Sequence, residues 1–342
     1  MPPITLKPRN ERVTFDQLVG ELERVLSRNG FTRDESATMA RVFAESTRDG
    51  VHSHGVNRFP LFIQHVRKGI VKTGVAPELV HAVGAFERWD GHGGAGILNA
   101  LHSMGRAIAL AEKHGVGCVG LRHTNHWMRA GTYGLQAADA GCIGICWTNT
   151  IALMPPWGGQ QVRVGNNPVV IAAPRQGGHL LLDMAMSQFS VGRIESAARS
   201  GEPLPADAGF DSSNHVTRDP AAVLKTKRLL PIGLWKGVGL RILLDTLAAA
   251  VSEGHATHHI TAGSAETSLS QIFIAIDLKR IAAEKANVIV ESIVADVNSA
   301  TPSAPGAEVP SVPGQRMAER RARAERDGIA VRADIWREIQ AL

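Results

Sequence analysis

The sequence of 342 residues predicts an α/β protein with a mainly helical N-terminal segment. Two observations predict this class. Apolar residues recur at helical spacing from Thr14 to Lys68, whereas from about Leu79 short apolar runs of strand length alternate with longer helical stretches. Helices that connect strands cross over the faces of a sheet, so this alternation indicates a parallel or mixed sheet.

Capping patterns define the N-terminal helices. Thr14 and Thr32 are each followed three residues later by Gln or Glu, which is the spacing of a capping box, and the two helical stretches stop at Gly30 and Gly50. A third helix is predicted over 60–68, because proline suits the first helical position and a glycine follows the stretch. Residues 1–78 are therefore expected to form a helical segment.

The change in periodicity divides the rest of the chain. We expect an α/β core over 79–235, and over 236–342 further helices, one more core strand and a proline-rich connector. The loop-rich stretch 201–235 is a candidate wall of an active site. Strands are predicted over 117–121, 143–147, 169–173, 180–184 and 271–278, helices over 97–114, 127–140, 237–252 and up to about Val297, and the connector carries Pro302, Pro305, Pro310 and Pro313.

Composition and charge argue against several classes of protein. With 44% apolar and 20% charged residues, the chain has the composition of a globular protein, and no stretch approaches the roughly 18 apolar residues of a membrane span. The net charge of +5 is dispersed, which argues against a nucleic-acid groove and suits a small anionic substrate. The densest basic run, 316–326, is interrupted by two glutamates and is interpreted as a solvated helix face. A nucleic-acid binder that uses this run is kept as an alternative.

Two further features concern the cellular compartment. The first residues, MPPITLKPRNERVTF, lack the apolar region of a signal peptide. Cys118, Cys142 and Cys146 lack the C-x-x-C spacing of metal sites, so they are expected to be reduced structural thiols. The sequence therefore predicts a cytoplasmic protein.

The stretch WDGHGGAG contains glycines at the G-x-G-x-x-G spacing of dinucleotide-binding loops. Its context is unfavourable, because residues 81–90 alternate like a half-exposed strand and Arg122-His123 follows the next strand, where an acidic residue would bind the ribose. Arginine suits a 2′-phosphate, so a Rossmann site stays open. The alternative is a tight glycine loop that leads into a helix.

Two polar clusters carry the chemistry. RDGVHSHGVNRF places His52, Ser53, His54 and Arg58 in one loop between helices. RHTNHWMRAG places His123, Asn125 and His126 after the predicted strand 117–121. The alternative for the first cluster is a polar connecting loop, and that for the second is a structural histidine. H-x-H also suits a metal ion, although the segment before it is helical rather than the strand that metal-dependent hydrolase barrels place there.

Two more charged residues stand at element ends. Asp183 ends an apolar strand, where a buried carboxylate requires a partner, and its alternative role is a helix or turn cap. Lys236 stands at the start of a helix, where an ammonium and backbone amides suit a phosphate, and its alternative is an ordinary solvated lysine.

Several long stretches, in order along the chain, resemble one family. They are DGVHSHGVNRFPLFIQHV, NHWMRAGTYGLQAADAGCIGICWTNTIALMPPWGG, GNNPVVIAAP, LLDMAMSQFS, LLPIGLWKG and SQIFIAID. The chain resembles the malate/L-lactate/sulfolactate dehydrogenase family, which lacks a Rossmann fold, from about Val13 to Leu342. The resemblance implies a homodimer and a three-layer α/β/α core with a mixed sheet. It also implies a helical domain built from the N-terminal and C-terminal segments.

The resemblance further implies where a nicotinamide cofactor, NAD or NADP, is held. The matching residues are His179, Leu180, Leu181, Leu182, Asp183, Met184, Ala185, Trp235, Lys236, Gly314, Gln315 and Arg316. The glycine stretch 91–96 is not among them. The family usually carries an acidic residue shortly after Pro-Gly, where this chain has Arg316, so we hypothesise a shift toward NADPH.

In the family the histidine of the S-H-G motif, here His54, is the proton donor. Hydride addition to a ketone develops alkoxide charge, and a histidine with a pKa near about 6.5 is suited to quench it. We expect Asp183 to orient this ring and Arg58 to hold a substrate carboxylate through two parallel hydrogen bonds. Residues expected to bind substrate hydroxyls or the carbonyl oxygen are Ser53, His126 and Thr148.

The sequence thus predicts an NAD(P)H-dependent reductase of a small 2-oxo acid, with no metal ion, nucleic acid or membrane as partner. Related substrates in the family are pyruvate, oxaloacetate, sulfopyruvate and cyclic imino acids. The alternative from a different class is a metal-dependent hydrolase that uses His52 and His54.

Overall fold

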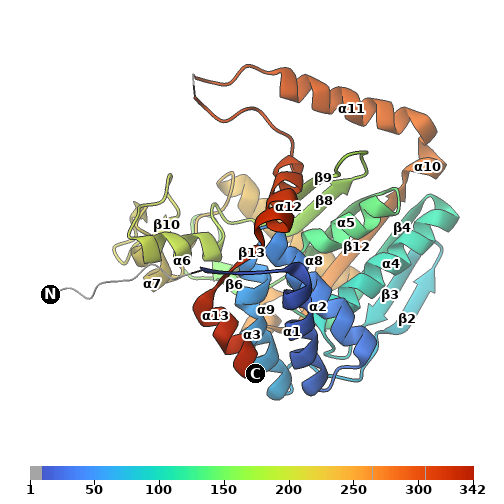
Figure 1. Cartoon of the computed structure of the whole chain (residues 1–342), viewed down its shortest axis with the longest axis horizontal. Coiled ribbons are helices and arrows are strands. Elements are labelled where there is room, and N and C mark those ends of the chain that lie inside the picture. The colour runs from blue at the N-terminus through green and yellow to red at the C-terminus, as the bar shows by residue number, and fades with distance from the viewer. Residues whose placement is uncertain (1–9, 264, 305) are drawn as a thin grey trace.

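The computed structural model describes residues 10–263, 265–304 and 306–342, with a seven-stranded sheet at its centre (Figure 1). The strands are β2 (Glu78–Val83), β3 (Phe86–Asp90), β4 (Val116–Asn125), β5 (Cys142–Thr148), β8 (Val169–Ala173), β9 (Leu180–Met184) and β12 (Thr267–Asp277). Their order is β2-β3-β4-β12-β5-β8-β9. Strands β3 and β4 pair in parallel and the other neighbours pair antiparallel, so the predicted mixed sheet is confirmed.

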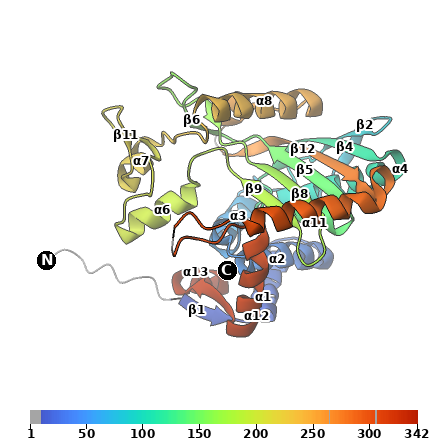
Figure 2. The same cartoon turned by 90° about the horizontal axis from the view of Figure 1, so that it is seen from above.

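Helices cover both faces of this sheet (Figure 2). They are α4 (Gly96–His114) and α5 (Gly131–Asp139) on one face and α8 (Trp235–Ser252) on the other. Neighbouring residues of β12 point to opposite faces: Phe273 lies in a core with residues of α4 and α5, and Ile272 lies in a core with Leu244 and Ala248 of α8. This arrangement confirms the predicted three-layer α/β/α fold.

Both ends of the described chain build a helical domain beside the sheet. Its elements are β1 (Asn10–Val13), α1 (Phe15–Arg28), α2 (Arg33–Arg48), α3 (Phe59–Arg67), β13 (Ile329–Arg332) and α13 (Ala333–Ala341). Both predicted capping boxes are present, at Thr14 and Thr32. Strand β1 pairs antiparallel with β13, and Trp336 and Ile339 of α13 join the core of α1, α2 and α3.

The remaining elements lie around the sheet. They are β6 (Ala152–Met154), β7 (Val164–Gly165), α6 (Val191–Ser200), β10 (Gly209–Phe210), β11 (Val216–Thr217), α7 (Pro220–Thr226), α9 (Thr257–Ala262), α10 (Leu278–Ile281), α11 (Ala283–Ser299) and α12 (Gln315–Asp327). Helices α6 and α7 share a small separate core. Helix α11 lies along the outside, and α12 is the next helix in the described chain (Figure 1). No helix in the described part of the chain is both long and apolar enough to cross a membrane.

Two sequence expectations concern positions outside the described residues. Residues 1–9 include most of the start on which the signal-peptide expectation rests, and Pro305 belongs to the predicted connector. The three cysteines are all free, and Cys142 and Cys146 are buried, as predicted.

Two elements differ from the prediction. The helix predicted over 127–140 begins only at Gly131, because Met128 adopts a positive φ of 62° and the Asp183 carboxylate accepts from the Gly131 amide. The half-exposed strand predicted over 81–90 is instead the hairpin of β2 and β3. It turns at Gly84, where φ is 55°.

The glycine stretch 91–96 forms a tight loop that leads into α4. A Cβ atom at Gly96 would lie 2.2 Å from the carbonyl oxygen of Asn125 and 2.4 Å from that of His126. The Asn125 side chain donates to the carbonyl oxygens of Gly93 and Gly94. Glycine is therefore required for close packing on the end of β4, as the alternative to a dinucleotide fingerprint predicts.

Candidate active site

The loop that carries His54 is fixed to the end of α2. His52–His54 and Val56–Arg58 form two short 3-10 helices, and the Val56 amide donates to the Thr47 hydroxyl over 3.0 Å. A Cβ atom at residue 55 would lie 2.3 Å from the same hydroxyl, so Gly55 permits this close contact. The loop is therefore anchored to the end of α2.

His54 and His126 lie face to face at the centre of the site. Their ring centroids are 5.5 Å apart and the ring planes differ by 19°. The Ser53 hydroxyl lies 3.1 Å from Nδ1 of His54. Burial, and then the charge of Arg58, lower the pKa of His54 to about 4, so its ring is neutral at pH 7 in the free protein.

The protonation of His126 follows from its hydrogen bond. The Met128 amide donates to Nδ1 of His126 over 2.9 Å, so the proton of the neutral ring is on Nε2. Burial, the charge of Arg58 and the neighbouring His54 lower the pKa of His126 well below its ordinary value. His126 is therefore a neutral donor beside His54.

Arg58 lies in the same part of the site and faces an acidic residue that sequence reasoning missed. Its guanidinium is 3.9 Å from the carboxylate of Glu266, and the Arg58 side chain is 36% exposed. Burial raises the pKa of Glu266, although the charge of Arg58 opposes this shift. A long, partly exposed ion pair leaves guanidinium donors for an incoming carboxylate.

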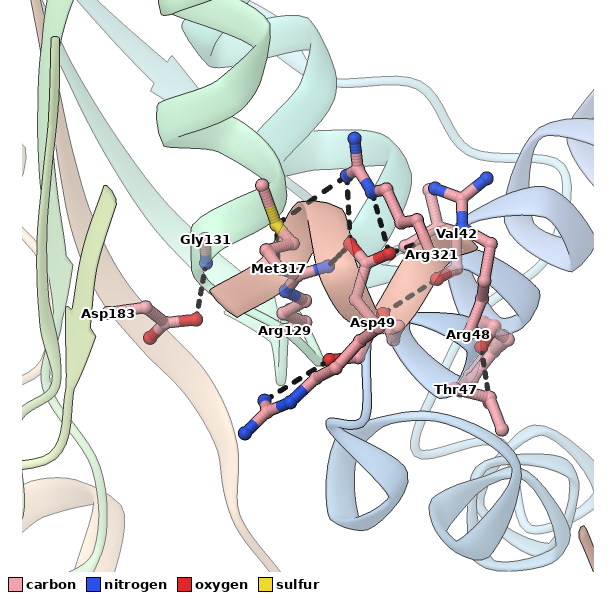
Figure 3. A network of polar contacts seen from close by, with 12 residues as sticks. Val42, Thr47, Arg48, Asp49, Arg129, Gly131, Asp183, Met317 and Arg321 are labelled. Carbon is pink, nitrogen blue, oxygen red and sulfur yellow. Dashed lines mark hydrogen bonds and ion pairs between the residues drawn. The ribbon is translucent and has the colours of Figure 1, made fainter. Parts of the chain in front are cut away.

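Asp183 has a different partner from the one expected. Its carboxylate accepts from the backbone amide of Gly131 over 2.8 Å at the start of α5, rather than from His54 (Figure 3). Desolvation of the carboxylate raises the pKa of Asp183. The hydrogen bond from Gly131 and the charge of Arg129 oppose that rise. The structure thus gives Asp183 the alternative role of a helix cap.

Thr148 also differs from the expectation. It is 2% exposed, and its hydroxyl donates to the carbonyl oxygens of Asn149 and Ser270. The hydroxyl proton is thus used inside the protein, at the end of β5. In this conformation Thr148 does not present a donor to a substrate.

The segment predicted around Gly314 lies against β9, the edge strand of the sheet. The Leu181 amide donates to the Pro313 carbonyl over 3.0 Å. Gly314 has a φ of 94°, and a Cβ atom there would lie 2.7 Å from the carbonyl oxygen of His179. Glycine therefore lets α12 begin directly on this strand.

The third predicted segment lies beyond the end of β9. The Ile232 amide donates to the Met186 carbonyl, and α8 starts three residues later with Trp235 and Lys236. Trp235 is 60% exposed. The structure thus brings residues 179–185 and 314–316 together at the edge strand β9, and the loop before Trp235 pairs with the residues that follow this strand.

The basic run on α12 is only partly a solvated face. Arg316 is exposed and forms an ion pair with Glu308 over 2.5 Å, whereas Arg321 makes two hydrogen bonds of 2.8 Å to the buried Asp49 (Figure 3). The expectation of a solvated face is therefore wrong for Arg321. Helix α12 packs near α2, and this contact could not be seen from the charge pattern.

The H-x-H motif does not have the arrangement of a metal site. His52 lies near the positive charge of Arg320, which together with burial lowers its pKa, and His54 stacks on His126. Within the described residues, no group of three or more His, Cys, Asp or Glu side chains is arranged to hold a metal ion. His123, which sequence reasoning grouped with His126, points elsewhere and pairs with Asp90 over 2.8 Å.

Comparison with known proteins agrees with the geometry. A family model described as malate/L-lactate dehydrogenase matches residues 13–340. The chain is 42% identical over 333 residues to proteins named 2,3-diketo-L-gulonate reductase from Citrobacter koseri and Escherichia coli, which covers 97% of this chain and 100% of each relative.

Solved structures give the same result. Sulfolactate dehydrogenase from Methanocaldococcus jannaschii superposes with a TM-score of 0.87 at 27% identity, over 96% of this chain and 95% of that chain. Delta1-piperideine-2-carboxylate reductase from Pseudomonas syringae gives a TM-score of 0.83 at 27% identity, over 97% and 99%. This chain is therefore an oxidoreductase that belongs to the malate/L-lactate dehydrogenase family.

Proposed function

We propose that this enzyme reduces 2,3-diketo-L-gulonate to 3-dehydro-L-gulonate with NADH or NADPH. Relatives of that name are 42% identical to it. The observation that carries the proposal is the grouping of His54, His126 and Arg58 at one point of the fold. In the step, a hydride with its electron pair forms a C–H bond at the C2 carbonyl carbon. The carbonyl π electrons move to oxygen, which takes up a proton.

Arg58 is assigned to the substrate carboxylate. Its guanidinium is partly exposed, and its ion pair with Glu266 is long, at 3.9 Å. A planar guanidinium binds a carboxylate through two parallel hydrogen bonds, which fixes the position of the adjacent carbonyl. The substrate is thereby oriented beside the two histidine rings.

His54 supplies the proton. The bound carboxylate offsets the charge of Arg58, which is one cause of the low pKa of His54, and so favours the imidazolium. Ser53 lies at Nδ1 of the ring, so Nε2 is the atom that donates to the developing alkoxide. The Nε2–H group of His126 donates a hydrogen bond to the same oxygen or to a neighbouring hydroxyl.

The residues along β9 fit a nicotinamide cofactor, which supplies the hydride when bound. The exposed Trp235 indole offers an apolar surface, and Gly314 holds the start of α12 against β9. We assign the holding of the cofactor to residues 179–185, 235–236 and 314–316. We assign Asp183 to the cofactor side because it belongs to β9 and its carboxylate accepts from Gly131 rather than from His54.

The second candidate is the reduction of another 2-oxo acid or of a cyclic imino acid. It is favoured by the structural likeness to proteins named for sulfolactate and for delta1-piperideine-2-carboxylate. Arg58 and the histidine pair would serve all of these substrates, since each carries a carboxylate beside a carbon that accepts hydride.

The test is the oxidation of NADH and NADPH, followed by absorbance, with a panel of 2-oxo acids and cyclic imino acids. We expect 2,3-diketo-L-gulonate to give the highest kcat/KM of the panel. Turnover of only another member would keep the reductase and replace the substrate. Oxidation of neither cofactor with any member of the panel would contradict the proposed reaction.

A homodimer is part of the proposal. Apolar residues of α8 and α11 are exposed in the single chain, among them Leu243 at 60% and Val288 at 70%. Apolar faces of this kind mark surfaces that another protein covers. Light scattering of the purified protein should give twice the chain mass of 36.5 kDa. A cytoplasmic location stays a prediction.

A further inference from the structure

A buried ionic cluster joins three parts of the molecule that the proposed reaction uses (Figure 3). Its centre is Asp49, which is 1% exposed and ends α2. Arg321 donates to both oxygens of the Asp49 carboxylate over 2.8 Å, and Arg129 donates to one of them over 2.5 Å. Arg48 lies 3.2 Å from the other oxygen. One carboxylate is thus shared by three guanidinium groups.

The cluster is ordered by more than charge. A guanidinium with two parallel bonds to a carboxylate fixes both distance and orientation. The sulfur of Met317, one turn before Arg321 on α12, accepts from Arg129 over 3.2 Å. The hydrogen bonds from Arg321 and the charge of Arg129 outweigh the effect of burial and lower the pKa of Asp49, so the carboxylate stays ionised.

Asp49, Arg129 and Arg321 are each close in sequence to a segment of the candidate site. Asp49 precedes the His54 loop, which is tied to α2 through Thr47. Arg129 follows the His126 loop and precedes Gly131, the partner of Asp183. Arg321 lies six residues after Gln315, a helical rise of about 9 Å from the segment that rests on β9.

Beside the cluster, a cavity of about 630 Å³ opens between the helical domain and the core. It is lined by residues of α1, α2, α4 and α5 and by Arg48, Arg129 and Arg321. Apolar packing is interrupted there. Beside this cavity, the Asp49–Arg321 ion pair links the end of α2 to α12. Ala324 of the same helix packs farther along on the core of the helical domain.

We propose that the Asp49–Arg321 ion pair is a positioning device that holds the cofactor segment at the start of α12 in register with the His54 loop. Arg321 acts through Gly314 and its neighbours and does not touch the reacting atoms. Asp49 acts in the same way through the His52–Arg58 loop. The inference rests on the proposed function, because the position of the cofactor segment matters only if a nicotinamide cofactor binds there.

The test measures cofactor binding apart from turnover, as quenching of protein fluorescence by NADH and by NADPH. Arg321→Gln removes the two bonds and leaves Asp49 paired with Arg129 and Arg48, so the variant should fold. We expect Kd and KM for the preferred cofactor to rise about tenfold. The KM for the 2-oxo acid at saturating cofactor should change less than about threefold.

Two further variants separate the effect of the planar guanidinium of Arg321 from the effect of its charge. Arg321→Lys keeps the charge without the planar fork, so it should restore part of the lost cofactor affinity. Arg323→Ala removes an exposed cation from the same helix and should leave Kd within about twofold of the parent. A merely structural role predicts a lower Tm for Arg321→Gln with an unchanged cofactor Kd, and that result would overturn the inference.

The outcomes separate this inference from the proposed function. A parent protein that binds neither cofactor would overturn both. A parent that binds, with an Arg321→Gln variant of equal affinity, would overturn the positioning role alone. Equal loss in Arg321→Gln and Arg323→Ala would assign the effect to net charge and would also overturn it.

Discussion

The proton-donor side and the cofactor side of this site are assembled in different ways. On the first side, His54 and Arg58 come from one short loop, and the ring of His126 lies 5.5 Å from that of His54. On the second side, residues 179–185 and 314–316 meet at β9, whereas Trp235 follows a loop that pairs with the chain beyond this strand and is 60% exposed. One side is compact and half-buried, and the other is spread along the chain and more exposed.

This difference indicates what each side contributes. The histidine pair is held by backbone hydrogen bonds and close packing in the free protein, so little reorganisation is needed when substrate binds. The cofactor side offers exposed surface whose contacts form only on binding. Substitutions on the first side should therefore lower kcat, and those on the second should mainly change cofactor affinity.

The largest effect is expected for His54. His54→Gln keeps a polar side chain of similar size but removes the acid, so kcat for the reduction should fall by about 10² to 10⁴-fold. Stopped-flow measurement of the hydride step would show this with cofactor Kd unchanged. His215→Gln, at an exposed turn, is the control. Full activity of His54→Gln would mean that another group supplies the proton.

The comparison also shows how far sequence reasoning reaches. The His52–Arg58 loop could be predicted because its polar residues are contiguous and lie between two helices with clear caps. Glu266 and Asp49 could not be predicted, because their roles depend on partners distant in sequence: Arg321 is 272 positions from Asp49. Asp49 belongs to the quoted stretch RDGVHSHGVNRF, but nothing in that stretch indicates its partner.

Local geometry explains why the structure differs from the expectations for Thr148 and for the start of α5. Thr148 ends a strand, as ligand-binding residues often do, but its hydroxyl donates to the carbonyl oxygens of Asn149 and of Ser270, which is 122 positions away. The late start of α5 depends on the positive φ of Met128, which no periodicity reveals. The layers of the sheet were predictable because burial patterns repeat along each element.

The second effect tests substrate orientation. Arg58→Ala should raise KM for the 2-oxo acid by about 100-fold, and Arg58→Lys by about tenfold, because lysine keeps the charge but loses the fork. The fold should tolerate the loss of the Arg58 charge beside Glu266, because burial already raises the pKa of Glu266 and favours its neutral acid. Steady-state kinetics at saturating cofactor gives the result. An unchanged KM in Arg58→Ala would place the carboxylate elsewhere.

The third effect is the pH dependence of the proton-donor side. Reduction requires the imidazolium of His54, whose pKa in the free protein is lowered to about 4. Above pH 5, kcat/KM for reduction should therefore fall by about tenfold per pH unit. The decline of kcat should begin at a higher pH, because the carboxylate of the bound substrate offsets the charge of Arg58 and raises the pKa of His54.

Arg58→Ala provides the matched variant for this profile. Removing the cation beside His54 should move the free-enzyme pKa upward, toward the ordinary value of histidine. Oxidation of the hydroxy acid requires the neutral ring, so its kcat/KM should be independent of pH above pH 5 and should fall only in more acidic solution. A kcat/KM for reduction that stays flat from pH 5 to pH 8 would exclude His54 as the titrating acid.

The smallest effect is expected on the open cofactor side, at Arg316. Its guanidinium is held by Glu308 in an exposed ion pair, so the arginine that suggested NADPH is partly neutralised by an acid from the connector. Glu308→Gln frees Arg316 for a 2′-phosphate and should raise the NADPH/NADH ratio of kcat/KM by about threefold. Arg316→Glu should shift the ratio toward NADH. Glu325→Gln, farther along α12, is the control for net charge, and an equal rise there would show that the pair does not set cofactor preference.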